Sequence, residues 1–172
     1  MILSGREIHN RMGEDIIIEP YDRFKLNPNS YNLTLGNRLL VYDKKKLDMK
    51  KPNPFHELTI PEDGLWLKPG WIYLAETVEK TKTKNLVPMV EGRSSIGRLG
   101  LFVHVSAGFG DNNFDGKWTL ELHCVQPIKI YPDIDICQIY YHEIKGECDE
   151  YNGKYNKNNG VMPSRMWTEF QK

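Results

Sequence analysis

The stretch SAGFGDNNFDGKWTLELH, residues 106–123, decides the fold class of this chain. Its first part, residues 106–116, holds three glycines and two adjacent asparagines, which are typical of tight bends. Its second part, Lys117–His123, carries the aromatic and β-branched side chains that strands favour. The stretch therefore predicts a hairpin that leads directly into an antiparallel strand.

Further short strands are expected on both sides of this stretch, separated by turn residues such as Pro69-Gly70. Short strands at regular spacing are typical of an antiparallel sandwich or barrel, so the sequence predicts a mainly β fold. The expected strands cover residues 65–67, 71–76, 87–90, 101–105, 117–123, 128–131 and 136–142.

The amino-terminal third predicts one helix and one more hairpin. Ser4 and Glu7 have the spacing of a capping box, and an apolar face continues to Met12, so we expect a helix over residues 2–12. Residues 31–35 alternate between apolar and polar side chains, and Gly36-Asn37 predicts a turn into a second strand over 39–42.

Two segments are expected to lie outside the strands. Residues 43–57 are rich in Lys, Asp, Asn and Pro and predict a solvated loop. The tail from Gly146 to Lys172 holds few aliphatic side chains before Val161. It is expected to be a mobile arm that closes over a site or reaches a neighbouring subunit.

Composition favours one globular domain over residues 1–172, with 40% hydrophobic and 27% charged residues. Lys plus Arg equals Asp plus Glu at 23 each, so no overall field attracts a nucleic acid polymer or an acidic membrane. Any phosphate binding must therefore be local.

The expected location is the cytoplasm. Cys124, Cys137 and Cys148 include no closely spaced pair and are odd in number, which indicates reduced structural thiols. Neither a signal peptide nor an apolar run long enough to span a membrane occurs in the sequence.

The densest polar cluster lies between two expected strands, at residues 91–98, EGRSSIGR. Arg93 and Arg98 supply guanidinium donors, Ser94 and Ser95 supply hydroxyls, and the glycines allow a phosphate chain to approach the backbone. The alternative is a polar turn that caps a helix at Ser94. Taken alone, the cluster leaves both interpretations open.

Glu121 stands among Trp118, Leu120 and Leu122 in the strand that follows the glycine-rich hairpin. A carboxylate desolvated by such neighbours favours its neutral form and suits proton transfer. The alternative is that strand alternation points Glu121 at water. The pattern alone does not separate the two.

A zinc ion is a common way to activate water in a hydrolytic site, because a zinc-bound water is already acidified. This sequence has no H-x-E followed by P-C-x-x-C, and its five histidines are dispersed without ligand spacing. A zinc-independent chemistry is therefore expected.

The two clusters resemble those of the dCTP deaminase family, including its bifunctional members that also act as dUTPases. The matching blocks keep the family order over essentially the whole chain. They are MILSG at 1–5, SYNLTLG at 30–36, EGRSSIGRLGL at 91–101, VHVSAG at 103–108, DNNFDGKWTLE at 111–121, ICQ at 136–138 and YNGKY at 151–155.

The resemblance implies a homotrimer of distorted β-barrels of the dUTPase-like, β-clip type, with a short amino-terminal helix and active sites built between subunits. Its substrates would be pyrimidine deoxynucleoside triphosphates, carried with Mg²⁺ on their phosphates.

The resemblance also implies roles for individual residues. Glu121 matches the proton shuttle of the deaminase, and the carbonyl of Ala107 matches a partner of the catalytic water. Asp111 matches the residue that receives the 3′-hydroxyl and, in dUTPase chemistry, activates water. Ser94 matches a position near the catalytic water as well as one that binds phosphate. The other implied substrate-binding positions are Arg93, Ser95, Arg98, Gln138, Tyr151, Lys154 and Asn158.

One departure from the family pattern surrounds Asp111. The family usually has a branched apolar residue before the matched Asp and Pro or Ala after it, whereas this chain has Gly110 and Asn112-Asn113. A looser and more polar hairpin is expected. His104 and His123 are expected to be strand histidines satisfied in packing, with a place in the lining of the site as the alternative, and Trp118 is expected to be a core or subunit-contact residue.

The leading interpretation is deamination of dCTP to dUTP, with onward hydrolysis of dUTP to dUMP and diphosphate left open. A pure dUTPase is the first alternative, although such enzymes generally lack a Glu at position 121. A non-catalytic trimeric nucleotide sensor on the same fold is the second.

Overall fold

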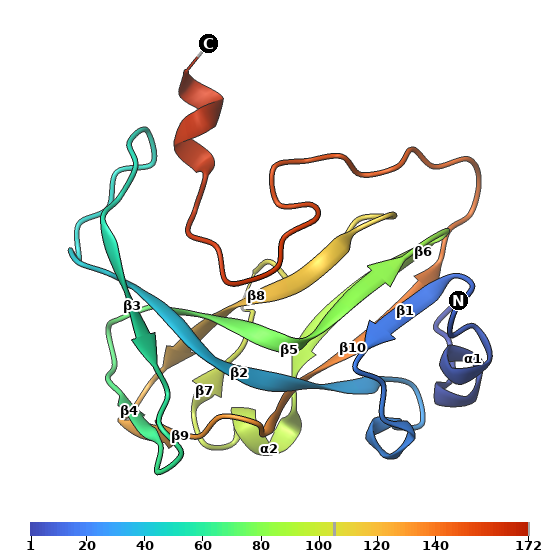
Figure 1. Ribbon diagram of the computed structural model, residues 1–172, viewed down its shortest axis with the longest axis horizontal. Coiled ribbons are helices and arrows are strands. Elements are labelled where there is room, and N and C mark those ends of the chain that lie inside the picture. Colours follow the sequence, from blue (N-terminus) through green and yellow to red (C-terminus); the bar gives the residue numbers. More distant parts are fainter. Residues whose placement is uncertain (105, 172) are drawn as a thin grey trace.

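The computed structural model describes residues 1–104 and 106–171 and has the expected mainly β fold, a nearly closed barrel (Figure 1). One sheet has the strand order β6-β10-β2-β5-β8-β7, with β1 paired to β5 and β3 paired to β2, and β4 and β9 form a separate pair. The elements are α1 (Gly5–Asn10), β1 (Ile16–Glu19), η1 (Arg23–Lys25), β2 (Tyr31–Tyr42), β3 (Phe55–Thr59), β4 (Leu65–Leu67), β5 (Tyr73–Thr83), β6 (Leu86–Gly92), α2 (Ser94–Gly97), β7 (Leu101–Phe102), β8 (Asp115–Cys124), β9 (Ile128–Ile130), β10 (Asp135–Glu143) and η2 (Met166–Phe170).

The expected strands exist, with shifted ends. Residues 65–67 form β4 as predicted, and the expected strand 117–123 lies within β8. Of the expected strand 101–105, β7 contains residues 101–102, and Val105 lies outside the described residues. Two strands were not anticipated, namely β1 and β3, and β3 occupies the end of the segment expected to be a loop.

The turn predicted at Gly36-Asn37 is wrong, because β2 continues through both residues. Its register with β5 shifts between Leu35 and Leu39, as in a β-bulge. Gly36 is needed there because a Cβ at this position would lie 2.9 Å from Cγ of Glu76. The glycine therefore allows two strands to approach closely rather than reversing the chain.

β5 extends beyond the expected end at Glu76 because it buries polar side chains. Thr77, Glu79, Thr81 and Thr83 of its second half are all buried. The Glu79 carboxylate accepts hydrogen bonds from the Thr34 amide at 2.8 Å and from Lys25 Nζ at 2.7 Å. Burial alone would lower the pKa of Lys25, but its hydrogen bond and charge interaction with Glu79 raise it.

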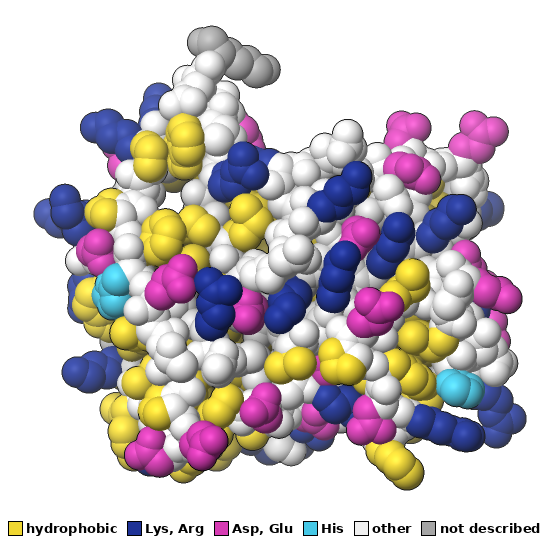
Figure 2. All heavy atoms as spheres, viewed as in Figure 1, with side chains coloured by type: hydrophobic (Ala, Val, Ile, Leu, Met, Phe, Trp, Pro, Cys, Tyr) yellow, Lys and Arg dark blue, Asp and Glu magenta, His cyan; other side chains and the backbone are white. Residues whose placement is uncertain are grey.

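The amino-terminal helix is shorter than predicted but capped as predicted. α1 covers residues 5–10, and the Glu7 amide donates to Ser4 Oγ at 3.2 Å. None of the helices in the described part of the chain is long and apolar enough to cross a membrane. Cys124 and Cys137 are buried, Cys148 is exposed, and all three are free. Basic and acidic side chains are interspersed over the face in Figure 2.

The carboxy-terminal arm, expected over residues 146–172 and described to residue 171, folds back along β8 (Figure 1). Lys157 N donates to the Asp115 carbonyl at 2.6 Å, and Lys117 N donates to Asn158 Oδ1 at 3.0 Å. Val161 packs with Leu40, Tyr42 and Leu74 in a small apolar cluster. The arm therefore docks on its own barrel.

Candidate active site

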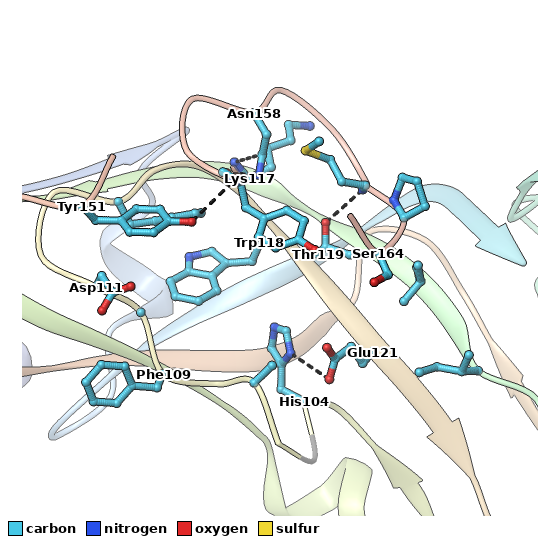
Figure 3. A pocket seen from close by; sticks show the side chains of 18 of the residues that line it. His104, Phe109, Asp111, Lys117, Trp118, Thr119, Glu121, Tyr151, Asn158 and Ser164 are labelled. Atoms are coloured by element: carbon cyan, nitrogen blue, oxygen red, sulfur yellow. Dashed lines mark hydrogen bonds and ion pairs between the residues drawn. The ribbon is translucent and has the colours of Figure 1, made fainter. Parts of the chain in front are cut away.

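A pocket of about 550 Å³ opens between β8, the segment that leads to Asp111, and the arm (Figure 3). This volume is in the range of small-molecule sites. We refer to it as the arm pocket. It is lined by Tyr42, Leu47, Ile72, Leu74, His104, Ala107, Phe109, Gly110, Asp111, Phe114, Lys117, Trp118, Thr119, Glu121, Tyr151, Tyr155, Asn158, Met162, Pro163 and Ser164.

Glu121 faces this pocket and not the core. The alternation of β8 buries Trp118, Leu120 and Leu122 and turns Glu121 to the other face, with Thr119 and Lys117. Its side chain is 31% exposed. The carboxylate is therefore neither fully desolvated nor freely solvated, the two alternatives that the sequence left open. The Glu121 carboxylate makes no hydrogen bond to any residue of 1–104 or 106–171, which leaves its oxygens available to a ligand.

His104 lies next to Glu121 and was not among the predicted site residues. Its Nδ1 lies 3.8 Å from Glu121 Oε2, and its side chain is only 4% exposed. Neither ring nitrogen has a hydrogen-bond partner within the described chain. The backbone at His104 has φ of 51°, a left-handed conformation that a strand pattern does not anticipate. The histidine was expected in packing, and the sequence held no signal for its contact with Glu121.

Asp111 lies at the opposite side of the pocket, on a hairpin that is firmer than expected (Figure 3). Asn112 is buried, and its Oδ1 accepts from the Asn85 amide at 2.8 Å. Its Nδ2 donates to the Asp149 carbonyl, and its carbonyl accepts from the Tyr151 amide at 2.9 Å. The polar side chain next to Asp111 therefore ties the hairpin to the arm.

The arm brings three of the predicted residues toward this pocket in different ways. Tyr151 and Asn158 line it. The Asn158 amide is already engaged, because Oδ1 accepts from Lys117 N and Nδ2 donates to the Tyr155 carbonyl at 3.0 Å. Lys154 is not among the lining residues and pairs with Glu169, which raises the pKa of Lys154.

Three hydrogen bonds that no sequence pattern indicates attach the arm above the pocket. Val161 N donates to Glu76 Oε2 at 2.9 Å, Met162 N donates to Thr119 Oγ1 at 3.1 Å, and Ser164 N donates to the Tyr42 hydroxyl at 2.9 Å. The acceptors come from β5, β8 and β2, so the arm position is set by three strands at once.

The arginine and serine cluster lies elsewhere. Arg93, Ser94, Ser95 and Arg98 surround α2 and are not among the residues that line the arm pocket. Arg93 caps α2 and donates from Nη1 to the Asp135 carbonyl at 2.9 Å, whereas the Arg98 side chain makes no hydrogen bond to a described residue. The exposed apolar side chains Leu99, Phe102 and Val125 lie in or next to the same α2–β7 segment and the end of β8.

Gln138 is also separate from the arm pocket. It lies on β10, accepts from Ser30 Oγ at 2.9 Å, and lines a smaller hollow of about 270 Å³ with Asn29, Ser30 and Tyr140. In the described part of the chain, no group of three His, Cys, Asp or Glu side chains is arranged to hold a metal ion.

Comparisons with known proteins agree with this architecture. The family described as dCTP deaminase-like matches residues 2–144. Two similar proteins are both named "dCTP deaminase, dUMP-forming". The one from Hathewaya histolytica is 61% identical, with 99% of this chain and 100% of that protein covered. The one from Clostridium botulinum (strain Eklund 17B / Type B) is 63% identical, with both chains fully covered.

A solved structure supports the fold. The 2′-deoxycytidine 5′-triphosphate deaminase from Agrobacterium tumefaciens superposes with a TM-score of 0.65 at 21% identity, over 81% of this chain and 47% of that one. At this identity the likeness concerns the arrangement of the strands and not the site.

Proposed function

Because the chain belongs to the dCTP deaminase-like family, we propose that it deaminates dCTP to dUTP and ammonia and then hydrolyses dUTP to dUMP and diphosphate. The observation that carries the proposal is the arm pocket, in which Glu121 and Asp111 face one cavity of nucleotide size under a docked arm. Relatives above 60% identity over the full chain, named as dUMP-forming, favour the two-step reaction over deamination alone.

Glu121 is the proton carrier of the deamination in this proposal. Its carboxylate takes a proton from water as the oxygen bonds to carbon 4 of cytosine, and delivers it to ring nitrogen 3. It then transfers the second proton of that water to the amino group, the carbon–nitrogen bond breaks, and ammonia leaves. The lack of a hydrogen-bond partner for Glu121 within the described residues supports this role, because both oxygens remain available.

Asp111 binds the sugar and serves the second reaction. Its carboxylate accepts a hydrogen bond from the 3′-hydroxyl of the nucleotide and activates the water that attacks the α-phosphorus of dUTP. The bond to the leaving diphosphate breaks, so one water yields dUMP and diphosphate. The Asn112 contacts support this role, because they fix the backbone next to Asp111 and so limit where its carboxylate can lie.

The triphosphate is held from a neighbouring subunit. Arg93, Ser94, Ser95 and Arg98 carry the groups that suit phosphate, yet they do not line the pocket of their own chain. A homotrimer in which α2 of one subunit faces the arm pocket of the next unites the two sets, and it covers Leu99, Phe102 and Val125. Ser94 then orients the water together with the Ala107 carbonyl, while Gln138, Tyr151, Lys154 and Asn158 complete the substrate contacts.

Mg²⁺ is part of the substrate in this account, bound by the phosphates of the nucleotide. The location we infer is the cytoplasm, where deoxynucleoside triphosphates are used. Neither a nucleic acid polymer nor a membrane is a partner in this proposal.

Product analysis separates the proposal from its two rivals. The purified protein is incubated with dCTP and, separately, with dUTP in the presence of Mg²⁺, and ammonia, dUMP and diphosphate are measured. We expect ammonia from dCTP and dUMP from both nucleotides. A pure dUTPase would give product from dUTP alone, and a nucleotide sensor would give no product from either.

Mixed trimers test the shared site. Glu121→Gln and Arg98→Ala subunits are each expected to be nearly inactive, but every trimer that contains both kinds has one site with an intact Glu121 and an intact Arg98. Random reassembly should therefore restore about a quarter of the wild-type activity. If each site used residues of one chain alone, the mixture would stay inactive.

A further inference from the structure

Gly110 and Trp118 are in direct contact at the base of the hairpin that carries Asp111. A Cβ placed on Gly110 would lie 2.5 Å from Cη2 of Trp118, closer than real Cβ contacts allow. Gly110 is not among the residues with positive φ, so its backbone conformation is open to any residue. It is the indole, and not the backbone angle, that first excludes a side chain here.

Trp118 of β8 is held firmly by the neighbouring strand β5. Its amide donates to Thr77 Oγ1 at 3.0 Å, and its indole Nε1 donates to Thr81 Oγ1 at 2.9 Å. The ring packs on Phe114 with centroids 4.7 Å apart and meets the His104 ring edge-on at 6.2 Å. With 5% of its surface exposed, Trp118 is closely packed by these neighbours.

The other side of Gly110 is closed by Pro88. The Gly110 amide donates to the Pro88 carbonyl at 2.8 Å, and the same hypothetical Cβ would lie 2.8 Å from Pro88 Cγ. The residue before Asp111 is thus enclosed between Trp118 of β8 and Pro88 of β6. Through this contact the indole sets where the Asp111 backbone can lie.

We propose that Trp118 is a positioning residue for Asp111, and that Gly110 and Trp118 form a matched pair that fixes the contact with the nucleotide sugar. The large indole fills the space that a side chain at position 110 would need, and this explains why a glycine precedes Asp111 in this chain. The inference rests on the proposed function, in which Asp111 receives the 3′-hydroxyl.

The test compares deamination of dCTP with that of 2′,3′-dideoxycytidine triphosphate, which lacks the 3′-hydroxyl. The wild-type protein should prefer dCTP by roughly 100-fold or more in kcat/KM, because a site built around a hydroxyl leaves Asp111 unpaired with the analogue. Gly110→Ala should reduce this preference roughly tenfold and lower kcat/KM for dCTP about 10- to 100-fold. Trp118→Leu should also reduce the preference, and Asp111→Ala should abolish it.

The two positions should be coupled. In a Trp118→Leu background the closest clash at position 110 is removed. The factor by which Gly110→Ala lowers kcat/KM for dCTP should therefore be about tenfold smaller than in the wild type. Trp118→Phe, which also lacks the Cη2 atom but keeps an aromatic ring, serves as the second background should Trp118→Leu fail to fold. Unfolding midpoints measured in parallel report any change in stability.

The outcomes are distinguishable. Absence of ammonia from dCTP with the wild-type protein would contradict the proposed function itself. If the wild type deaminates dCTP with the expected preference and Gly110→Ala and both Trp118 variants keep that preference, the matched pair alone is overturned. General damage to the protein would lower kcat/KM for both nucleotides equally and leave the preference unchanged. The matched pair would also be overturned if Gly110→Ala lowered kcat/KM by the same factor in the wild type and in the Trp118 backgrounds. A wild type that does not prefer dCTP over the dideoxy analogue would overturn it too.

Discussion

Glu79 of β5 and Glu121 of β8 are carboxylates on adjacent strands with opposite surroundings. The Glu79 side chain is 1% exposed and accepts from the Thr34 amide, the Thr34 hydroxyl and Lys25. The Glu121 side chain is 31% exposed, and its Oε2 lies 3.8 Å from Nδ1 of His104, beyond hydrogen-bond distance. A carboxylate whose oxygens are all engaged stabilises the fold, whereas one left open toward a pocket is available for chemistry.

The largest expected effect is at the open carboxylate. Glu121→Gln keeps the shape of the side chain but cannot carry a proton, so deamination of dCTP should fall by about 10³–10⁴-fold. Nucleotide binding, measured by calorimetry, and the urea unfolding midpoint should both stay near the wild-type values. Turnover within tenfold of the wild type would remove Glu121 from the mechanism.

Arg93 and Arg98 next to α2 also differ in whether their side chains have a partner inside the described chain. Arg98→Ala removes a side chain with no partner in the described chain, so kcat/KM for dCTP should fall about 100-fold without a change in the unfolding midpoint. Arg93→Ala also removes the hydrogen bond to the Asp135 carbonyl, so it should lower stability by about 1 kcal/mol in addition to activity. Equal stability losses in the two variants would contradict the difference drawn between them.

At the engaged carboxylate the effect should be on stability. Glu79→Gln leaves Lys25 without its strongest partner inside the protein. The free energy of unfolding should fall by about 3 kcal/mol, at the lower end of the range for a broken buried pair, because Lys25 keeps contact with water. Urea denaturation measures the loss. The specific activity of the folded fraction should remain within a few-fold of the wild type, and a selective loss of activity would contradict the structural role.

The smallest expected effect is at Glu76, which accepts from Val161 N on the arm at 2.9 Å. Glu76→Ala should weaken arm docking by about 1–2 kcal/mol and raise KM for dCTP roughly tenfold with little change in kcat. The arm should also become more sensitive to limited proteolysis. Glu62→Ala, at an exposed carboxylate, is the matched control. Equal sensitivity of both variants to proteolysis would contradict the role of Glu76 in arm docking.

Much of the barrel could be predicted because most strands show the apolar alternation of a half-buried surface. The second half of β5 could not, because its buried face is made of Thr77, Glu79, Thr81 and Thr83. A polar pattern of this kind predicts a solvated segment. The partners that allow Glu79 to be buried lie 45 and 54 residues away in the chain, so no local pattern indicates them. The turn predicted at Gly36 was wrong because glycine is common both where two strands approach closely and where the chain reverses.

The candidate site was predicted in its parts and not in its assembly. Asp111 and Glu121 share a pocket as the sequence clusters suggested. The contact of His104 depends on a left-handed backbone that no pattern signals, and the arm contacts join residues 43 to 122 positions apart. The arginine and serine cluster at α2 is the remaining part, and it meets the pocket only in the proposed trimer, through a second subunit.

A crystal structure of the Glu121→Gln variant with dCTP and Mg²⁺ tests the central claim most directly. We expect carbon 4 of the cytosine within roughly 3.5 Å of a water held by the side chain at position 121. The phosphates should be contacted by Arg98 and Ser94 from a neighbouring subunit of a trimer. A base bound away from position 121, or a triphosphate held by residues of a single chain, would contradict the account.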